Sequence, residues 1–269
     1  MKSSKMSELM DDPVTIDKNA SLSEALEIMK KEEYFELPVT HKDVYLGTLT
    51  YRDLARELGS ISKQSKPPSN LHVSTAYQKD GGNLKKEDDF KEGVCSLADR
   101  GNYTLPILNE NSVIGVFKSE KALKSINFNE DLRIKEVISD NYEVISPNER
   151  VVHARRKLLD KDLDLLAVKQ RKDIIGSVTD IEIAKGMASF RELVPDKKQD
   201  SRIRNLLVED ILNNNTIIID SKTNLNDLIK EINSNKIRDI IVEEENELKG
   251  SINQLDILES WCENARQMG

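Results

Sequence analysis

The sequence predicts a mixed α+β fold made of four copies of one βαββα repeat. Two observations support this prediction. A short motif that begins with glycine recurs four times along the 269 residues, and the residues upstream of each copy align at the same offsets without gaps. A repeat of about 55 residues buries too little apolar surface to be stable alone, so we expect the copies to pack against one another.

The motif reads GTLTYRDL, GVFKSEKA, GSVTDIEI and GSINQLDI in the four copies. These stretches begin at Gly47, Gly115, Gly176 and Gly250, which are 68, 61 and 74 residues apart. Each glycine follows a polar turn, and each stretch passes from a short strand pattern into a helical pattern. The motif therefore predicts the end of a strand and the beginning of a helix in every copy.

An amphipathic helix and a buried strand precede each motif. In the first copy Leu22, Ala25, Leu26 and Met29 follow the i, i+3, i+4, i+7 pattern of one helical face. An extended piece comes before the helix in turn. The predicted extended pieces are 13–17, 81–85, 142–146 and 216–220, the helices 21–31, 89–99, 150–160 and 224–234, and the strands 35–39, 103–107, 164–168 and 238–242.

The linkers group the repeats two by two. Within the stretch SINFNEDLRIKE at 125–136, only 127–131 lie between the bounds of the second and third copies, whereas longer insertions lie within the two pairs. The insertion at 60–70 is rich in Ser, Lys and Pro, which is typical of a mobile loop. We place the repeats at 1–59, 71–126, 132–187 and 203–262, with linkers at 60–70 and 187–202.

Composition narrows the class of protein. The formal net charge is -8, which argues against nucleic acid or an anionic membrane as the default partner. No run reaches the roughly 18 apolar residues of a membrane-spanning helix, and the N-terminal residues lack the apolar middle of a secretory signal. Cys95 and Cys262 lie far apart in unrelated contexts, so we expect unpaired thiols and a cytoplasmic location in a reducing cytosol.

The repeat resembles the cystathionine β-synthase (CBS) domain. The resemblance rests on an S-x-x-E-A-x-x-x-M helix at 21–29, an L-P-V strand at 37–39 and the G-x-x-T-x-x-D motif of Gly47, Thr50 and Asp53. One such motif is weak, but four in register cover nearly the whole chain. The resemblance implies two paired modules, often called Bateman modules, that stack into a flat disc supplied here by one chain.

The resemblance also implies a regulatory function. CBS modules bind adenosine-containing ligands such as AMP, ADP, ATP, S-adenosylmethionine or methylthioadenosine in clefts between repeats, and so modulate a partner. The expected partners are such a ligand and an unidentified protein, and self-association into a homodimer stays open. Two alternatives remain: a scaffold whose clefts have decayed, and a ligand-regulated nucleic-acid binder with a basic patch at 171–174 and 196–205.

No catalytic or metal-binding motif is found in the sequence. The three histidines form no HExxH motif or close pair, and no glycine-rich phosphate loop occurs. We therefore expect no enzyme activity, no catalytic cofactor and no metal. The one tryptophan, Trp261, is interpreted either as packing within the disc or as an anchor for a partner.

Each cleft needs a hydroxyl at the helix start, a carboxylate for the ribose hydroxyls, and apolar walls for the adenine. Thr50 and Asp53 supply the polar groups in the first copy, although Thr-x-x-Asp is also the pattern of a helix capping box. The third and fourth copies offer Thr179 with Glu182, and Asn253 with Asp256. The predicted ligand-binding residues are Val14, Thr15, Ile16, Pro38, Thr50, Asp53, Ile145, Ala167, Thr179, Glu182, Ile217, Ile241, Asn253 and Asp256.

The second copy departs from this pattern. Lys118 and Lys121 replace the threonine and the aspartate, which leaves no acceptor for a ribose, so its cleft is expected to be empty or filled by its own side chains. The residues just before the strands are mostly acidic or neutral, which favours AMP, S-adenosylmethionine or methylthioadenosine over ATP. Residues considered for phosphate contacts are Arg52, Lys118, Lys121 and Arg238.

Overall fold

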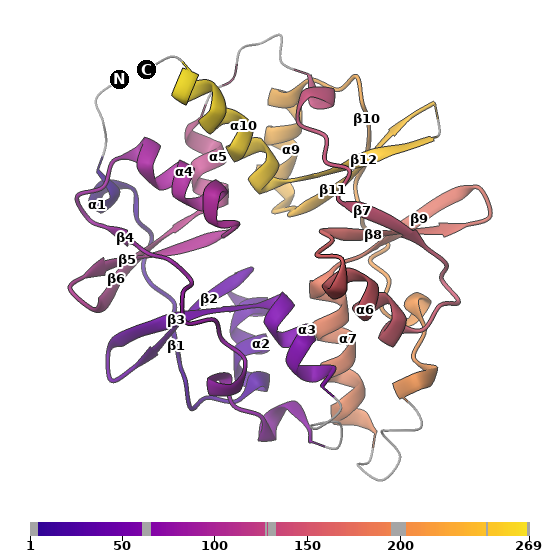
Figure 1. Cartoon of the computed structure of the whole chain (residues 1–269), viewed down its shortest axis with the longest axis horizontal. Helices are drawn as coiled ribbons and strands as arrows, with labels where there is room; N and C mark the ends of the chain where they lie inside the picture. The colour runs from indigo at the N-terminus through magenta and orange to yellow at the C-terminus, as the bar shows by residue number, and fades with distance from the viewer. Residues whose placement is uncertain are drawn as a thin grey trace.

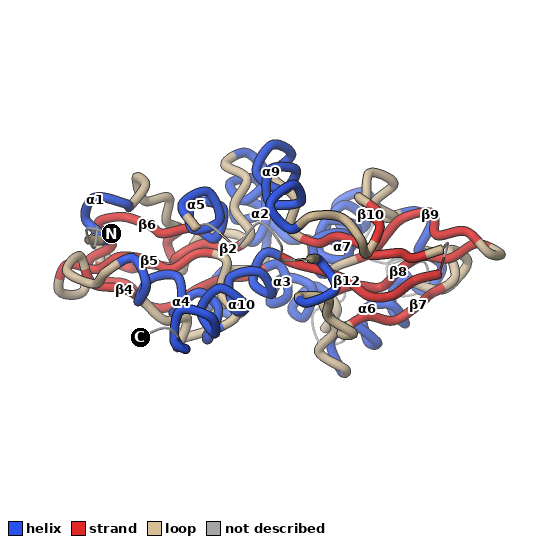
Figure 2. Tube along the Cα trace, turned by 90° about the horizontal axis from the view of Figure 1, so that it is seen from above, coloured by secondary structure: helices blue, strands red, loops and turns tan. Residues whose placement is uncertain are grey.

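The computed structural model describes residues 5–60, 66–126, 128, 133–194, 203–245 and 247–267. Within them the chain forms four three-stranded sheets. Figure 1 shows these sheets with their helices as four quadrants around a common centre, and Figure 2 shows that the assembly is thin when seen edge-on. The predicted mixed α/β fold with four repeats is confirmed. Among the described residues, no helix has the length and apolar character needed to cross a membrane.

Repeats one and two occupy the left half of Figure 1. The elements of repeat one are β1 (Ile16–Asp17), α2 (Leu22–Lys31), β2 (Glu36–His41), β3 (Val44–Thr50) and α3 (Tyr51–Leu58). Those of repeat two are β4 (Leu84–Lys85), α4 (Phe90–Arg100), β5 (Thr104–Asn109), β6 (Ser112–Lys118) and α5 (Ser119–Ser125). In each sheet the first strand runs parallel to the second, and the second runs antiparallel to the third.

The sheets of repeats three and four lie on the right of Figure 1 and have the same topology, and the last helix of repeat four reaches to the left, beside α4 and α5. The elements of repeat three are β7 (Tyr142–Ile145), α6 (Val151–Asp160), β8 (Leu165–Gln170), β9 (Asp173–Val178) and α7 (Asp180–Leu193). Those of repeat four are β10 (Ile218–Asp220), α9 (Leu225–Asn235), β11 (Asp239–Glu244), β12 (Glu247–Asn253) and α10 (Gln254–Gln267). Helix α7 continues beyond residue 187, so part of the predicted 187–202 linker is helical; residues 61–65 and 195–202 lie outside the described residues.

The helices join the modules, whereas the sheets join repeats within a module. One large apolar core combines repeats one and three, and α3 packs on α7 there. A second combines repeats two and four, with α4 packed on α10. Between the sheets of repeats three and four lies a small apolar cluster, while β2 contacts β5 and β3 contacts β6 in the other module. The predicted two-by-two grouping therefore describes the sheet contacts, and the largest cores cross between the pairs.

Within each module, the segment that precedes one repeat in the chain packs on the other repeat of the same module. Residues 5–11, which include α1 (Met6–Leu9), dock on repeat two through the Asp11–Val116 bridge. The segment before repeat two, with η2 (Pro68–Asn70) and η3 (Val73–Thr75), docks on repeat one. Module two repeats the exchange: η4 (Ile134–Glu136) belongs to the segment on repeat four, and η5 (Ile203–Asn205) and η6 (Val208–Asp210) to the segment on repeat three. We call these four docked segments the arms.

The arms explain the recurring glycine. Gly47 lies inside β3, and the backbone of Gln78 in the docked arm crosses directly over it. A Cβ at this position would overlap the carbonyl oxygen of Gln78, and φ is +151°. Gly176 in β9 has φ +152° and meets Asn213 of its arm in the same way. The glycine is therefore required by the close approach of a second chain segment, not by the turn that precedes it.

The two cysteines correct one expectation. Cys95 on α4 and Cys262 on α10 form a disulfide with their Cα atoms 5.6 Å apart, so the expectation of unpaired thiols is wrong. Their separation of 167 residues gave no local signal, because only the packing of repeat two on repeat four brings them together. The assignment to a reducing cytosol rested on unpaired thiols and loses that support.

We predict that Gly47→Ala lowers the free energy of unfolding by about 3 kcal/mol, because the new Cβ must displace the backbone of the arm. Gly101→Ala is the matched control, since Gly101 also has a positive φ of +68° but no atom lies within 4 Å of an added Cβ. It should cost only about 1 kcal/mol of backbone strain. Urea denaturation measures both values, and equal losses would contradict the role assigned to the arm.

Candidate functional site

Equivalent positions from all four repeats meet at the centre of the disc. They are the residues around the start of each second strand, joined in repeats one, three and four by residues at the start of the final helix, and they line a polar cavity of about 410 Å³. Each repeat contributes to the wall of this cavity, for example through Thr50, Arg100, Asp180 and Arg238 of repeats one to four. Because the repeats are related by approximate symmetry, one position in the repeat is presented to the same cavity up to four times.

Arg238 is the central cation of this cavity. Its side chain is only 8% exposed, and it donates from Nη2 to Asp180 Oδ1 at 2.5 Å and from Nε to Asp239 Oδ2 at 2.6 Å. The Phe35 and Tyr103 rings lie 5.7 and 5.3 Å from its Cζ atom. The guanidinium therefore contacts one side chain from each of repeats one, two and three as well as its own neighbour. Burial lowers its pKa, but the Asp180 and Asp239 carboxylates outweigh burial and hold that pKa well above its ordinary value.

Asp239 has one oxygen left without a partner. Its Oδ2 accepts from Arg238, but its Oδ1 is buried and has no hydrogen bond in the described part of the chain. The side chain is 7% exposed and lines the cavity. Burial raises the pKa of Asp239 to about 7, and the charge of Arg238 offsets this only in part. A buried carboxylate oxygen without a donor is unfavourable, so Asp239 retains hydrogen-bonding capacity that the described part of the chain does not use.

Glu36 connects repeats one and two by hydrogen bonds in the wall of the same cavity. Its Oε2 accepts from the backbone N–H groups of Tyr103 and Thr104, both at 3.1 Å, and from Asn102 Nδ2 at 3.3 Å. Burial raises the pKa of Glu36 to about 7 despite these three donors. Arg52 makes the corresponding link from repeat one to repeat three, with Nη1 2.7 Å from Asp162 Oδ1 and Nη2 2.5 Å from the Leu163 oxygen.

The predicted ribose carboxylates act as helix caps. Asp53 Oδ2 accepts from the Thr50 backbone N–H and hydroxyl at 3.1 and 2.7 Å, and the Thr50 hydroxyl accepts from the Asp53 N–H. Thr179 and Glu182 form the same capping box on α7. In repeat four the Asn253 N–H donates to Asp256 Oδ2 at 2.7 Å. The capping interpretation of this motif is therefore confirmed for the structure, and ligand binding by these residues stays a prediction.

The arms also bind the residue at the aspartate position of the G-x-x-T-x-x-D motif. In repeat one Gln78 Nε2 donates to the second oxygen of Asp53 at 3.0 Å. In repeat two Lys121, at the position equivalent to Asp53, pairs with Asp11 of its arm at 2.6 Å. Lys118 Nζ lies 3.5 Å from the centre of the Tyr34 ring, and burial lowers its pKa. The lysines of repeat two are thus engaged by side chains of the chain itself.

Four of the predicted residues line the central cavity: Thr50, Arg52, Arg238 and Asn253. Glu182 and Asp256 line two other cavities, of about 430 and 330 Å³. Burial, with neighbouring carboxylates, raises the pKa of Asp256 to about 7. The residues predicted to form the adenine walls do not line the central cavity. Five of them lie in strands, namely Ile16, Pro38, Ile145, Ala167 and Ile241, and three lie in the extended segments just before β1 and β10, namely Val14, Thr15 and Ile217.

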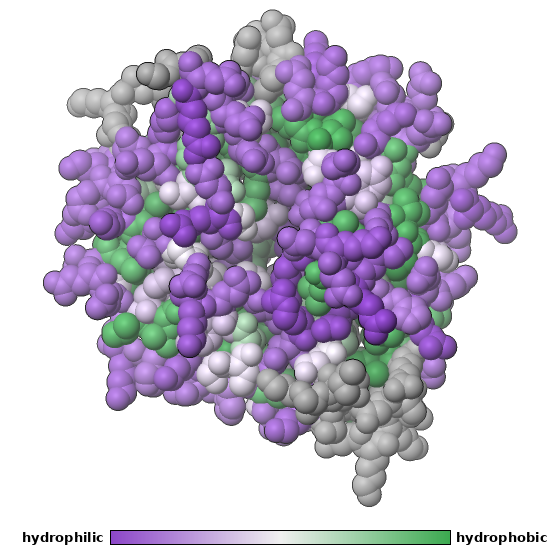
Figure 3. Space-filling view, viewed as in Figure 1, coloured by the Kyte–Doolittle hydropathy of each residue, from purple (hydrophilic) through white to green (hydrophobic). Residues whose placement is uncertain are grey.

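Sequence reasoning did not assign binding roles to Glu36, Arg100, Asp180 or Asp239. The sequence feature that could have indicated a shared role is the position in the repeat, because Glu36 and Asp239 are both the first residue of the second strand. Trp261 packs within the disc, with its ring 5.9 Å from that of Phe90. On the face shown in Figure 3, hydrophilic residues predominate and the hydrophobic ones form separate patches.

Fold and sequence together define a CBS-domain protein. A profile of the CBS domain family matches residues 6–60 and 208–262, which hold repeats one and four. The four sheet units show the same architecture in the two intervening repeats. Residues 6–60 and 208–262 are therefore CBS domains, as the resemblance of the repeats predicts.

Two curated proteins are similar in sequence. The uncharacterized protein MJ1404 of Methanocaldococcus jannaschii is 24% identical over 268 residues, which cover 92% of this chain and 59% of that protein. This chain thus spans 59% of the length of that relative. The CBS domain-containing protein YhcV of Bacillus subtilis is 26% identical over 102 residues, which cover 38% of this chain and 70% of YhcV.

A solved structure shares the fold of the whole chain. MJ1225 of Methanocaldococcus jannaschii, described as a candidate archaeal homolog of g-AMPK, superposes with a TM-score of 0.83. The match covers 96% of this chain and 100% of MJ1225 at 19% identity. At this identity the likeness establishes the shared fold.

We predict that the Asp11–Lys121 pair contributes to docking of the N-terminal arm. Lys121→Glu places two like charges together and should lower the free energy of unfolding by about 1 kcal/mol, a modest value because both groups are partly solvated. Adding Asp11→Lys reverses both charges and should restore most of this loss. A double-mutant cycle from urea denaturation measures the coupling, and strictly additive single effects would refute it.

We predict that Glu36 makes stability fall as pH rises. Its folded pKa of about 7 lies above its unfolded value, so the folded state binds more protons, and its stabilising effect is lost between pH values of about 4.5 and 7. Across this window the wild type should lose up to about 3 kcal/mol relative to Glu36→Gln, which cannot ionise. Urea denaturation at several pH values gives the difference. Glu27→Gln on the exposed face of α2 is the control, and a pH-independent difference for Glu36→Gln would contradict the assignment.

Proposed function

We propose that this chain is a regulatory protein that binds an adenosine-containing ligand between its repeats and modulates a partner protein. The observation that carries the proposal is the unpartnered Oδ1 of Asp239 in a polar cavity lined by all four repeats. A ribose hydroxyl or an amino group that donates to this oxygen supplies the missing hydrogen bond. Such a bond to a charged acceptor contributes about 1.5–3 kcal/mol.

The location of the cavity accounts for regulation. A ligand in it contacts both modules, so its affinity depends on how the modules are placed relative to one another. Binding then favours the arrangement with the higher affinity, and only this difference in affinity shifts the population. The partner protein reads the favoured arrangement. The structural relative MJ1225, described as a candidate homolog of g-AMPK, supports a role of this kind by analogy of fold.

The charges of the cavity favour a ligand with little negative charge. Its wall contains the guanidinium groups of Arg52, Arg100 and Arg238 and five carboxyl groups, those of Glu36, Asp162, Asp164, Asp180 and Asp239. Arg52 and Arg238 are already paired with carboxylates. Each added phosphate increases repulsion from the acidic groups, so we expect AMP, S-adenosylmethionine or methylthioadenosine to bind more tightly than ADP or ATP.

One observation favours a second function. The carboxylates predicted to bind ribose act as helix caps; they are Asp53, Glu182 and Asp256. They therefore have hydrogen-bond donors within the chain and do not need a ligand to supply them. A non-catalytic scaffold with closed clefts would have this arrangement. The two functions differ in whether the central cavity binds a small molecule.

Isothermal titration calorimetry with AMP, ADP, ATP, S-adenosylmethionine and methylthioadenosine tests the proposal. We predict that at least one binds and that Asp239→Asn weakens it by about 10–100-fold, because the amide keeps one acceptor oxygen and replaces the other with a donor. Glu27→Gln should leave the affinity unchanged. If none of the five ligands binds at millimolar concentration, the sensing function fails and the scaffold is favoured.

A further inference from the structure

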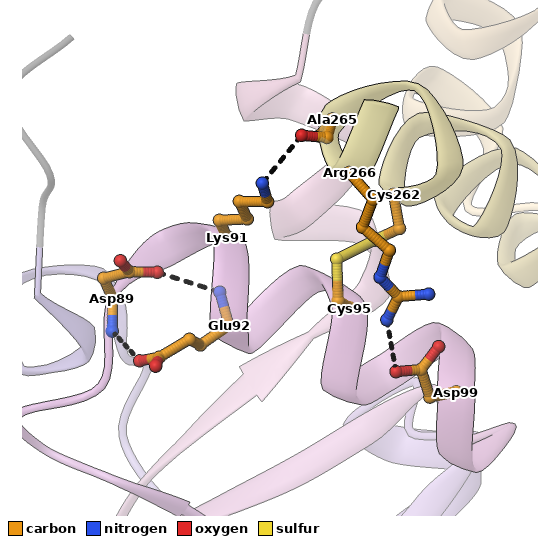
Figure 4. Close-up of a disulfide and its surroundings, with 8 residues drawn as sticks. All are labelled: Asp89, Lys91, Glu92, Cys95, Asp99, Cys262, Ala265 and Arg266. Atoms are coloured by element: carbon orange, nitrogen blue, oxygen red, sulfur yellow. Dashed lines mark hydrogen bonds and ion pairs between the residues drawn. A yellow bond between two sulfur atoms is a disulfide. The ribbon is translucent and has the colours of Figure 1, made fainter. Parts of the chain in front are cut away.

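The disulfide joins the two modules on one side of the disc only. Cys95 belongs to α4 of repeat two, and Cys262 belongs to α10 of repeat four, as Figure 4 shows. The opposite interface, where α3 packs on α7, contains no covalent link, because the chain has only two cysteines. There, backbone carbonyls of α3 accept from arginines of repeat three, for example the Ala55 oxygen from Arg155 Nε at 2.7 Å.

Noncovalent contacts surround the disulfide and place α10 firmly on α4. Lys91 Nζ donates to the Ala265 oxygen at 2.7 Å, and Arg266 pairs with Asp99 at 2.6 Å (Figure 4). Both partners of the Arg266–Asp99 pair are about half exposed, so this pair holds weakly in water. The disulfide is therefore the strongest constraint on the outer half of α10.

The same helix begins at the central cavity. Asn253 and Leu255 line that cavity, and Gln254 accepts from Ser119 Oγ at 2.6 Å and donates to the Ile237 oxygen at 2.6 Å. Cys262 follows Leu255 by two helical turns, roughly 10 Å along the axis. One continuous helix thus connects the disulfide to the cavity wall.

We propose that Cys95 and Cys262 form a redox-controlled clamp that sets the placement of α10, and with it the cavity wall of repeat four. In the oxidised protein the disulfide fixes α10 on α4, and module movement is confined to the α3–α7 interface. In the reduced protein the α4–α10 interface is held by noncovalent contacts alone and opens more often. The clamp does not depend on which ligand the cavity takes, or on whether it takes one.

The chemistry is thiol–disulfide exchange with a small thiol of the glutathione class. Cys95 is 7% exposed and Cys262 1%, so the reductant thiolate attacks Sγ of Cys95. The bond between the two protein sulfurs breaks, and Cys262 leaves as a thiolate that takes up a proton. A second reductant thiolate attacks the mixed disulfide, releases Cys95, and forms the disulfide of the reductant. Reoxidation by that small-molecule disulfide reverses both steps.

Hydrogen–deuterium exchange without any ligand tests the clamp. The oxidised wild type is compared with wild type reduced by dithiothreitol and with Cys95→Ser/Cys262→Ser. We predict that amides at 90–100 and 254–267 exchange about tenfold faster or more in the two unclamped forms, while those at 51–58 and 180–193 change by less than about twofold. Unfolding temperature should fall by about 5–15 °C on reduction, since the disulfide closes a long loop.

Three results would overturn the proposal. One is the finding of two free thiols per chain in the air-oxidised protein by thiol titration. A second is equal exchange at 90–100 and 254–267 in the oxidised and reduced states. The third is a response to dithiothreitol that persists in the double serine variant, which would place it outside these cysteines. Arg266→Gln is the matched control: it removes the neighbouring ion pair, and the redox response should remain.

Discussion

The buried charge of Arg238 is the constraint around which the disc is organised. A guanidinium taken out of water is strongly destabilising unless carboxylates and aromatic faces surround it. Here no single repeat supplies that environment: Asp180 comes from repeat three, Asp239 from repeat four, Phe35 from repeat one and Tyr103 from repeat two. Removing any repeat would expose or unpair the charge. The centre therefore favours the complete assembly over its parts, and it also brings together Glu36 and Asp239, whose pKa values burial raises to about 7.

The recurring motif is also the place where each arm packs on its repeat. The glycine admits the backbone of an arm, and in repeats one and two the residue at the end of the motif binds an arm side chain, as Asp53 binds Gln78 and Lys121 binds Asp11. A ligand that recruits Asp53 must compete with Gln78 and with the helix cap. Ligand binding would then alter a segment that crosses from one repeat to its neighbour, which provides a physical route from a cleft to the rest of the module.

Much of the fold was predictable because its determinants are local. The face formed by Leu22, Ala25 and Met29 predicts α2, and that helix spans Leu22–Lys31 with those residues buried. The site was less predictable. Thr50 and Asp53 mark a helix start in any context, whereas the roles of Glu36 and Asp239 depend on the other repeats that face them across the cavity. Cys95 and Cys262 carry no local pattern at all, so their pairing could not be anticipated.

The sequence by itself determined the repeat and its secondary structure, because hydrophobic periodicity and helix caps act over a few residues along the chain. Only the tertiary structure decided which repeats share a core, which arm docks on which repeat, and which side chains meet at the centre. These outcomes depend on contacts between residues far apart in sequence, where burial turns an ordinary carboxylate such as Asp239 into a group with a pKa of about 7 and an oxygen without a partner.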